Sequence, residues 1–352
     1  MAEKNTYTDR PIYIIGAGGI VNAAHLPAYA IAGYPVVGIY DIDEAKAAKT
    51  ASDFTIPEVY SSLQQMLDNA PVNAVFDIAV PGSAIADILN QLPAKAALLM
   101  QKPMGEDLAS AKKILEICRQ KEMIAAVNFQ LRYAPFIKQA RRMIDEGMLG
   151  EIYDIEVNVN VFTPWHLWNF LFTAPRMEIV YHSIHYIDLV RSFLGNPTSI
   201  YAKTIQHPSM TELASVRSNI IMDYGMQQRA NILTNHCHVY GKQRQQSYIK
   251  IEGSKGAIKI HFGVLKNYPE GESDRFEYIL MEDGKYNNWK TKAIKGSWFP
   301  HAFIGSMEQV LLAADGKIQQ PDNSVEDCIH TMACVEAAYI SSAQGGVRPD
   351  EC

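Results

Sequence analysis

Two histidines and a tyrosine stand together in the segment "VYHSIHYIDLVRSFLG", residues 180–195, where their side chains could carry acid–base or metal chemistry. Tyr181, His182 and His185 are three or four residues apart, so a helix would place them on one side. Because a free imidazole titrates near pH 6.5, His185 could take and return a proton at neutral pH. The same spacing could instead serve a metal ion, or form the polar side of a buried helix.

A second group of residues, near the start of the chain, predicts a dinucleotide site. Gly16 and Gly18 follow the apolar run "PIYII", where glycine permits a tight turn and lets a pyrophosphate approach the backbone. Val21 stands where the usual fingerprint has its third glycine or alanine. Asp41 ends the next predicted strand, where a carboxylate accepts hydrogen bonds from ribose hydroxyls and repels a 2′-phosphate. We therefore predict NAD as the cofactor, with NADP less favoured.

The elements that must position these residues alternate through the first part of the chain. Strands are predicted at 11–19, 35–41, 73–82, 96–103 and 124–129, and helices at 22–32, 43–54, 83–94 and 107–123. Alternating strands and helices indicate a parallel sheet with helices on both faces. The fold class expected for this part is a Rossmann doubly wound α/β domain, residues 1–127.

The remainder, residues 128–352, has a different pattern. Strands are predicted at 152–162, 199–206, 216–224, 228–239, 246–253 and 256–262, with a hairpin around Gly253 to Gly256 and helices at 300–316 and 325–343. Consecutive strands without helices between them indicate a mostly antiparallel sheet with one covered face. We therefore expect an α+β domain with a large open sheet.

Composition limits the classes of partner. Lys and Arg number 32 and Asp and Glu 38, a net charge of −6, and no Lys/Arg run is present, which argues against nucleic acid. No stretch approaches the roughly 20 apolar residues that cross a membrane, and the start "MAEKNTYTDR" lacks a signal peptide's apolar core. The five cysteines are widely spaced without a CxxC, which argues against disulfides and thiolate zinc sites and favours the cytoplasm. They are Cys118, Cys237, Cys328, Cys334 and Cys352.

The chain resembles the Gfo/Idh/MocA family of nicotinamide-dependent oxidoreductases. The motifs that carry the resemblance occur in the family's order: "GAGGIVNAAHLPAY", "YDIDEAKA", "DIAVPGS", "MQKPMGEDLASAKKI", "VNFQLRYAPFIKQARRMIDEGMLGEI" and "HSIHYIDLVRSFLG". The resemblance implies hydride transfer between NAD(P) and a sugar, cyclitol or sugar-derivative alcohol. It also implies that the last part of the chain packs near the first domain, and that the open sheet joins subunits into a homodimer or homotetramer.

The resemblance also assigns catalytic roles. The family's Glu-Lys-Pro motif reads Gln101-Lys102-Pro103 here, and its Asp-x-x-x-His pair has His185 at the histidine but Tyr181 at the aspartate. We predict His185 as the principal acid/base, Lys102 as the group that polarises the reacting oxygen, and Tyr181 as a hydroxyl-positioning or auxiliary acid/base group. The Asp-to-Tyr departure leaves the fold and cofactor intact and bears on mechanism and substrate.

The complete candidate set is larger. Cofactor-binding candidates are Gly16, Gly18, Gly19, Ile20, Val21, Asp41, Ile42, Ala79, Val80, Pro81, Gln101, Lys102, Pro103 and Asn128. Substrate-binding candidates are Lys102, Arg132, Trp165, His166, Trp168, Tyr181, His182, His185, Trp298 and His301. Tryptophans are included because the flat C–H faces of sugars pack on indole, although tryptophans also fill cores. Arg132 would contact substrate or only cap local structure.

Two alternative functions remain open. One is a metal-dependent lyase-like enzyme in which His166, His182 and His185, with His236 or His238, hold a divalent ion. The other is a non-catalytic sensor that keeps the dinucleotide pocket, which the Asp-to-Tyr change at Tyr181 leaves possible. Our preferred interpretation is the dehydrogenase, with no metal.

Overall fold

The computed structural model describes residues 9–282 and 284–349, so most of the polar start and Cys352 lie outside the described residues. The chain forms two compact units. The first runs to Ala134 and includes Phe299–Met332, and the second comprises Pro135–Trp298 and the residues from Ala333 onward. The boundary predicted between residues 127 and 128 falls inside the first of these segments.

The first unit contains a six-stranded sheet in the order β3-β2-β1-β4-β5-β6, with every adjacent pair parallel. Its strands are β1 (Ile12–Ile15), β2 (Val36–Tyr40), β3 (Glu58–Val59), β4 (Val75–Ile78), β5 (Ala97–Met100) and β6 (Ile124–Val127). Strands β1, β4 and β5 are buried along their whole length, which explains their continuous apolar sequences. The predicted doubly wound parallel sheet is confirmed.

Helices connect these strands. They are α1 (Leu26–Ala32), α2 (Glu44–Phe54), α3 (Leu63–Asn69), α4 (Gly82–Gln91) and α5 (Leu108–Gln120), and all of them except α3 overlap segments that the sequence predicts to be helical. Side chains cap several of them: Asp43 accepts from the Lys46 N–H at the start of α2, and Asp107 forms a reciprocal capping box with Ser110 at α5. The short β3 and α3 were not predicted, because β3 has only two residues and both are exposed.

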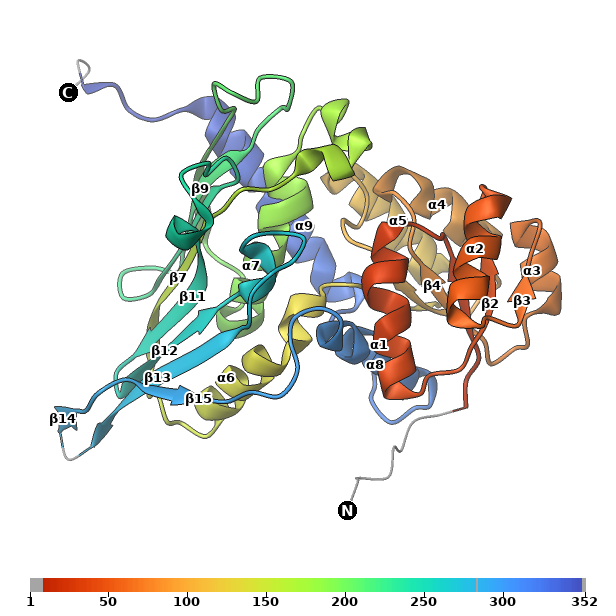
Figure 1. Cartoon of the computed structure of the whole chain (residues 1–352), viewed down its shortest axis with the longest axis horizontal. Coiled ribbons are helices and arrows are strands. Elements are labelled where there is room, and N and C mark those ends of the chain that lie inside the picture. Colours follow the sequence, from red (N-terminus) through yellow and green to blue (C-terminus); the bar gives the residue numbers. More distant parts are fainter. Residues whose placement is uncertain (1–8, 283, 350–352) are drawn as a thin grey trace. The chain divides into compact units, whose positions relative to one another are not determined.

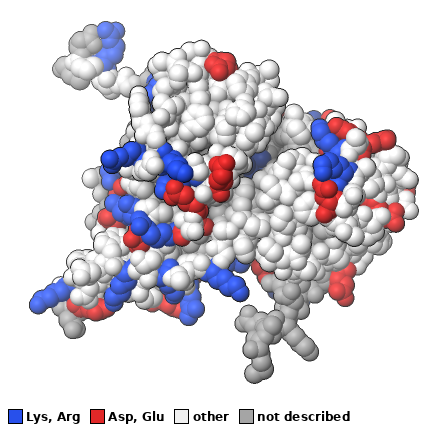
Figure 2. All heavy atoms as spheres, viewed as in Figure 1, with Lys and Arg blue, Asp and Glu red and all other residues white. Residues whose placement is uncertain are grey.

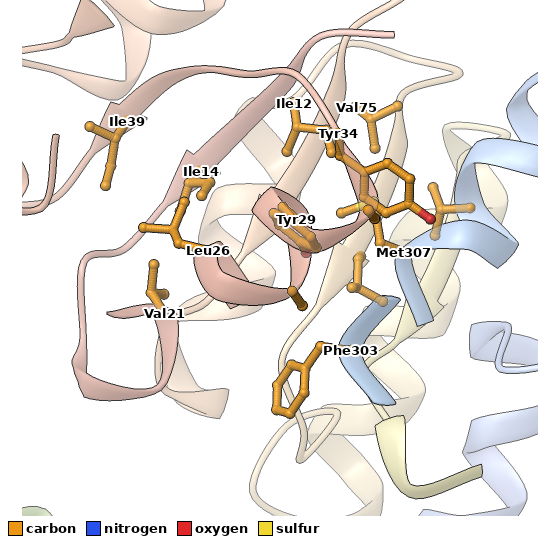
Figure 3. Close-up of a cluster of buried hydrophobic side chains, with 14 of the residues drawn as sticks. Ile12, Ile14, Val21, Leu26, Tyr29, Tyr34, Ile39, Val75, Phe303 and Met307 are labelled. Carbon is orange, nitrogen blue, oxygen red and sulfur yellow. The ribbon is translucent and has the colours of Figure 1, made fainter. Parts of the chain in front are cut away.

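A distant segment completes the core of this unit. Helix α8 (His301–Ala314) contributes Phe303 and Met307 to a buried cluster that also contains Ile12, Ile14 and Tyr29 (Figure 3). Full burial of such an apolar side chain stabilises the fold by about 1.5–3 kcal/mol. Because β1 contributes Ile12 and Ile14 to this cluster, the strand that leads into the glycine turn is fixed by core packing.

The second unit is built on a nine-stranded sheet in the order β14-β13-β12-β11-β7-β10-β9-β8, with β15 paired to β13. Its strands are β7 (Ile152–Asn160), β8 (Ser199–Ile205), β9 (Arg217–Asp223), β10 (Arg229–Asn235), β11 (Gln246–Gly253), β12 (Gly256–His261), β13 (Arg275–Glu282), β14 (Lys285–Tyr286) and β15 (Lys290–Lys292). Only the β7–β10 pair is parallel among the described strand pairs of this sheet. The mostly antiparallel sheet and the β11–β12 hairpin are confirmed, whereas β13–β15 were not predicted.

One face of this sheet is covered and the other is open. Along β9 and β10, Ile220, Met222 and Ile232 are fully buried while Ile221 and Leu233 are 40% exposed. Helices α6 (Pro135–Asp145) and α7 (Ile184–Leu194) lie on the covered side (Figure 1). The last helix, α9 (Val325–Gln344), reaches β8, where the Ala202 N–H donates to Ser341 Oγ at 2.9 Å. Buried and exposed side chains alternate along β9 and β10 with the period of two that is expected of a strand with one covered face.

Charged side chains of both signs lie on the surface of the protein. On the face drawn in Figure 2, basic and acidic side chains are interspersed and do not gather into one basic patch. Within residues 9–282 and 284–349, no helix combines the length and apolar character needed to cross a membrane.

Candidate functional site

The turn after β1 has the geometry that the glycines predicted. Gly16 has a φ of 107°, and a Cβ there would lie 2.5 Å from the Ala79 carbonyl oxygen, so no other residue fits without movement. A Cβ on Gly18 or Gly19 would meet no described atom within 4 Å. The backbone at Gly18 and Gly19 therefore has no side chain and no described neighbour on that side, so a phosphate could approach it closely.

Asp41 is held against this turn. Its Oδ2 accepts a hydrogen bond from the Ala17 N–H at 2.6 Å, and its Oδ1 accepts from the Asp43 N–H at 2.8 Å. The next residue, Ile42, is 91% exposed. The carboxylate is thus oriented by backbone donors at the end of β2 and keeps lone pairs for hydroxyls of a ligand, which fits an adenosine ribose.

The carboxyl ends of β4 and β5 add further candidates at the same sheet edge. The Ala79 N–H donates to the Ile15 carbonyl at 2.8 Å, and the Gln101 N–H donates to the Ile78 carbonyl at 2.8 Å. Val80 and Pro81 follow Ala79, and Lys102 and Pro103 follow Gln101. This edge, where the strand order reverses between β1 and β4, is where doubly wound sheets bind ligands.

A buried polar network that the sequence analysis missed supports this edge. His25 Nδ1 lies 2.7 Å from Asp77 Oδ2, and the Tyr29 hydroxyl donates to the same oxygen at 2.7 Å. His25 Nε2 lies 3.2 Å from both Gln101 Nε2 and Asn128 Nδ2, which places Asn128 beneath the predicted site. The Lys102 N–H donates to Gln101 Oε1 at 2.8 Å. The network therefore fixes the Gln101 amide and, through it, the backbone of Lys102.

Lys102 has a perturbed environment. Burial lowers the pKa of its ammonium from an ordinary value of 10.5 to about 8. The residue as a whole is half-buried. A lysine that loses its proton near neutral pH can hold or release that proton during a reaction, as catalytic lysines do.

Tyr181 lies in a short π-helix, called the π-turn below, and not in the regular α-helix that its spacing suggested. The π-turn covers Ile179–Ser183 and continues directly into α7, and such insertions are frequent at functional sites. The partly exposed Tyr181 ring makes an edge-to-face contact with Phe170 at 5.4 Å between centroids. It also packs against a small cluster that contains Trp165 and Leu171.

His185 occupies the first turn of α7 and keeps 9% of its surface exposed. Its ring lies edge-to-face on Trp298, with centroids 6.0 Å apart and planes at 89°. Trp298 is 2% exposed and packs in turn on Phe262 at 5.4 Å. The imidazole is therefore buried and held in a fixed orientation against an aromatic wall.

His182 points to different neighbours. Its ring lies 4.0 Å from the His236 ring and 6.3 Å from Trp165, between centroids. The fully buried carboxylate of Glu178 lies beside these two imidazoles. Glu178 was missed because nothing in a sequence pattern marks one carboxylate 58 residues from its partner His236.

The other candidates are distributed over both units. Trp165 is 5% exposed and belongs to a buried cluster, while Trp168 packs on Tyr268 at 5.7 Å. His166 is exposed. The alternative metal group of His166, His182 and His185, with His236 or His238, is not one of the two groups of close ligand atoms in the described residues, which are Glu178, His182 and His236, and Asp188, Asp327 and Cys328. His238 Nδ1 lies 3.3 Å from Asn160 Nδ2.

Two further candidates belong to the first unit. Arg132 is 7% exposed, and its guanidinium donates to the Asp322 carbonyl at 2.8 Å and to Asp327 Oδ2 at 2.5 Å. These contacts favour the local structural role for Arg132 over substrate binding. His301 is the first residue of α8 and is partly exposed.

The chain matches two family models that together cover most of its length. Residues 11–129 match a model described as "Oxidoreductase family, NAD-binding Rossmann fold", and residues 141–348 match one described as "Oxidoreductase family, C-terminal alpha/beta domain", both named for Gfo/Idh/MocA. The chain is 22% identical to D-apiose dehydrogenase of Paraburkholderia graminis over 94% of its own length and 87% of that protein. It is 25% identical to inositol 2-dehydrogenase/D-chiro-inositol 3-dehydrogenase of Lacticaseibacillus casei, over 70% and 71%.

Solved structures show the same fold. An Agrobacterium radiobacter oxidoreductase in complex with NAD⁺, L-tartaric acid and magnesium superposes with a TM-score of 0.79 and 19% identity, over 96% of this chain and 98% of that one. A putative myo-inositol dehydrogenase from Sinorhizobium meliloti gives a TM-score of 0.73 and 20% identity, over 95% and 98%.

Proposed function

Because the chain belongs to the Gfo/Idh/MocA family of NAD-binding oxidoreductases, we propose that it transfers hydride between NAD and a secondary alcohol of a carbohydrate-like molecule. Relatives named for D-apiose and inositol support a sugar or cyclitol as the substrate class. When bound, NAD supplies the hydride acceptor or donor. The protein must then bind the alcohol, orient it and move its hydroxyl proton.

The observation that carries the proposal is the edge of the parallel sheet. The glycine turn, the Asp41 carboxylate that the Ala17 N–H holds at 2.6 Å, and Lys102 all follow the carboxyl ends of β1, β2 and β5. A nucleotide turn, a ribose-binding carboxylate and a lysine of lowered pKa at one edge fit dinucleotide-dependent chemistry.

We assign three roles in the reaction. Lys102 polarises the reacting oxygen through its ammonium, His185 takes the hydroxyl proton during oxidation, and Tyr181 positions the hydroxyl. The supports are the lowered pKa of Lys102 and the edge-to-face contact that orients the His185 ring on Trp298. His166 and Trp168 precede Tyr181 in the chain; His166 is exposed and Trp168 is partly exposed. We propose both as substrate contacts.

The test is a screen for NAD reduction with purified protein over pentoses, hexoses, inositols, aldonates and glycosides. We expect at least one sugar or cyclitol to be oxidised with a stoichiometric gain of NADH. A sensor without catalysis would bind NAD and a sugar without any NADH appearing, which would contradict the proposal. A lyase would consume substrate with no net change in NADH.

Asp41 is proposed to select NAD over NADP. Asp41→Ala should weaken NAD binding by roughly 10- to 100-fold, because a hydrogen bond to a charged group contributes about 1.5–3 kcal/mol. The same variant should lower the preference for NAD over NADP, because the carboxylate that repels the 2′-phosphate of NADP is removed. Isothermal titration with each dinucleotide measures both effects.

A matched control separates ribose recognition from local structure. Asp43→Ala removes a nearby carboxylate that accepts from the Lys46 N–H at 3.2 Å and caps α2. It should leave the NAD/NADP ratio unchanged. If Asp41→Ala behaves like Asp43→Ala, Asp41 has no part in cofactor choice.

We also propose a cytoplasmic homodimer or homotetramer joined through the open sheet face. Supports are the apolar side chains on that face, which include Tyr201 at 59% exposure as well as Ile221 and Leu233. Four cysteines among the described residues are buried and form no disulfide there, which is compatible with a reducing compartment. Sedimentation equilibrium measures the mass: a monomer at micromolar concentration would contradict the assembly.

A further inference from the structure

The Glu178 side chain is a buried charge in the second unit. It is fully buried, as is His236, whose Nε2 lies 3.3 Å from Glu178 Oε1. Ser183 Oγ donates to Oε1 at 2.7 Å, and Ser218 Oγ donates to Oε2. A buried carboxylate that lies beside two imidazoles is also a potential ligand of a cation.

His236 is held in position from several sides. Its backbone N–H donates to the Val216 carbonyl at 3.1 Å, and its carbonyl accepts from the Thr163 N–H at 3.0 Å. Its Nδ1 lies 2.8 Å from Thr163 Oγ1. The Thr163 hydroxyl can donate or accept and therefore suits either tautomer of the ring; with the proton on Nδ1, the Nε2 lone pair can ligate a cation that lies between it and Glu178. A metal-binding histidine typically donates its other ring N–H in this way, which fixes the ring and its tautomer.

His182 brings a second imidazole to the same point. One ligand atom from each of Glu178, His182 and His236 lies within 4.8 Å of the other two. Two ligands about 2.1 Å from a tetrahedral zinc lie about 3.4 Å apart, close to the 3.3 Å between Glu178 Oε1 and His236 Nε2. His182 is partly exposed whereas the other two are buried, so an ion would enter from the His182 side.

We propose that Glu178, His182 and His236 bind one divalent transition-metal ion, Zn²⁺ in the first instance, with water as the fourth ligand. One carboxylate and two imidazoles suit zinc and its neighbours in the periodic table better than Mg²⁺ or Ca²⁺, which prefer oxygen ligands. The ion would neutralise Glu178. It would also tie the end of β10, where His236 follows Asn235, to the π-turn that carries Tyr181 and His182.

This site is independent of the proposed dehydrogenase reaction and is tested without it. Full-length protein is expressed in zinc-supplemented medium, purified without chelators or a metal-affinity tag, and analysed by plasma mass spectrometry. We expect about one zinc per chain, which chelator removes with a fall in Tm and which added Zn²⁺ restores. Co²⁺ added to stripped protein should give the intense visible bands of a tetrahedral site.

Three variants locate the ion. His182→Ala removes the most accessible ligand, and Glu178→Gln keeps the shape and hydrogen-bond acceptor but removes the charge; each should lower zinc content below about a tenth per chain. His207→Ala, in the loop after β8, is the control for loss of any histidine and should bind zinc as the wild type does. If Glu178→Gln fails to fold, His182→Ala and the Co²⁺ spectrum of the wild type still decide.

Two results would overturn the proposal. Wild-type protein without stoichiometric metal, whose Tm and visible spectrum do not respond to Zn²⁺ or Co²⁺, would leave Glu178 and His236 as a proton-linked ion pair. Equal zinc in the wild type and His182→Ala would place the metal elsewhere. Neither measurement depends on NAD reduction, so failure of this proposal and failure of the proposed oxidoreductase activity are distinguishable.

Discussion

His185→Ala is expected to lower kcat for the preferred alcohol by roughly 100- to 10,000-fold, which is the usual contribution of a general base. The imidazole is held edge-on to Trp298 and the residue is only 9% exposed, so alanine removes the proton acceptor and also leaves a cavity beside that tryptophan. Alanine cannot take the hydroxyl proton, and only solvent remains to do so. Steady-state NADH formation at saturating NAD measures the effect.

The controls distinguish a lost base from a damaged fold. His185→Gln keeps the polarity and much of the volume, and it should be nearly as inactive as His185→Ala because an amide is no base. The dissociation constant for NAD should be unchanged in both variants, because the role proposed for His185 concerns the alcohol proton and not the dinucleotide. Tyr181→Phe should lower kcat less than either. A fall of less than about tenfold in His185→Ala would remove His185 from the acid/base role.

The parallel sheet was predictable because its physics is local. Strands β1, β4 and β5 are buried on both faces and therefore appear as short apolar runs. The backbone at position 16, just after β1, has a φ of 107°, which glycine adopts more easily than other residues. What escaped prediction has weak local signals. The two-residue β3 and the charged strands β14 and β15 are exposed, so no apolar period marks them.

The helix around Tyr181 shows where a pattern is correct and incomplete. Residues 184–194 are helical as their apolar spacing predicts, but the five residues before them form a π-turn. Periodicity read over the whole segment cannot detect one wider turn, because the apolar positions differ by less than one residue between the two geometries. The turn changes which neighbours Tyr181 and His182 meet.

Long-range polar pairs account for the rest of what was missed. His25 and Asp77 are 52 residues apart and Glu178 and His236 are 58 apart, yet each pair is fully buried. A buried ionisable group needs a partner. Which of the many polar residues in the sequence becomes that partner is determined by the tertiary structure. Lys102, in contrast, was found because the motif after its strand is itself local.

Replacing Lys102 should produce the second large effect. Lys102→Met should reduce kcat/KM by roughly 100- to 1,000-fold, the scale seen when one preorganised electrostatic donor is lost. Because the pKa of Lys102 is lowered to about 8 by burial, the ammonium is present below pH 8 and is lost as the pH rises through that value. Wild-type activity should therefore fall on the alkaline side with an apparent pKa near 8.

Lys102→Arg tests this assignment, because a guanidinium stays charged at every pH used and cannot reproduce the titration. The variant should be slower than the wild type at pH 7, and its alkaline limb near pH 8 should be absent. If the limb persists in Lys102→Arg, another group titrates there and Lys102 is not the polarising ammonium.

Stability gives an independent measurement with a defined sign. Between about pH 8 and 10.5 the unfolded chain binds a proton at Lys102 that the folded chain has released. The free energy of unfolding therefore rises with pH across this window in the wild type. In Lys102→Met the contribution is absent, so the wild type should gain stability relative to the variant as the pH increases from 8 to 10.5. Urea titrations across that range measure the difference, and a flat or opposite trend would show that burial does not disfavour the ammonium.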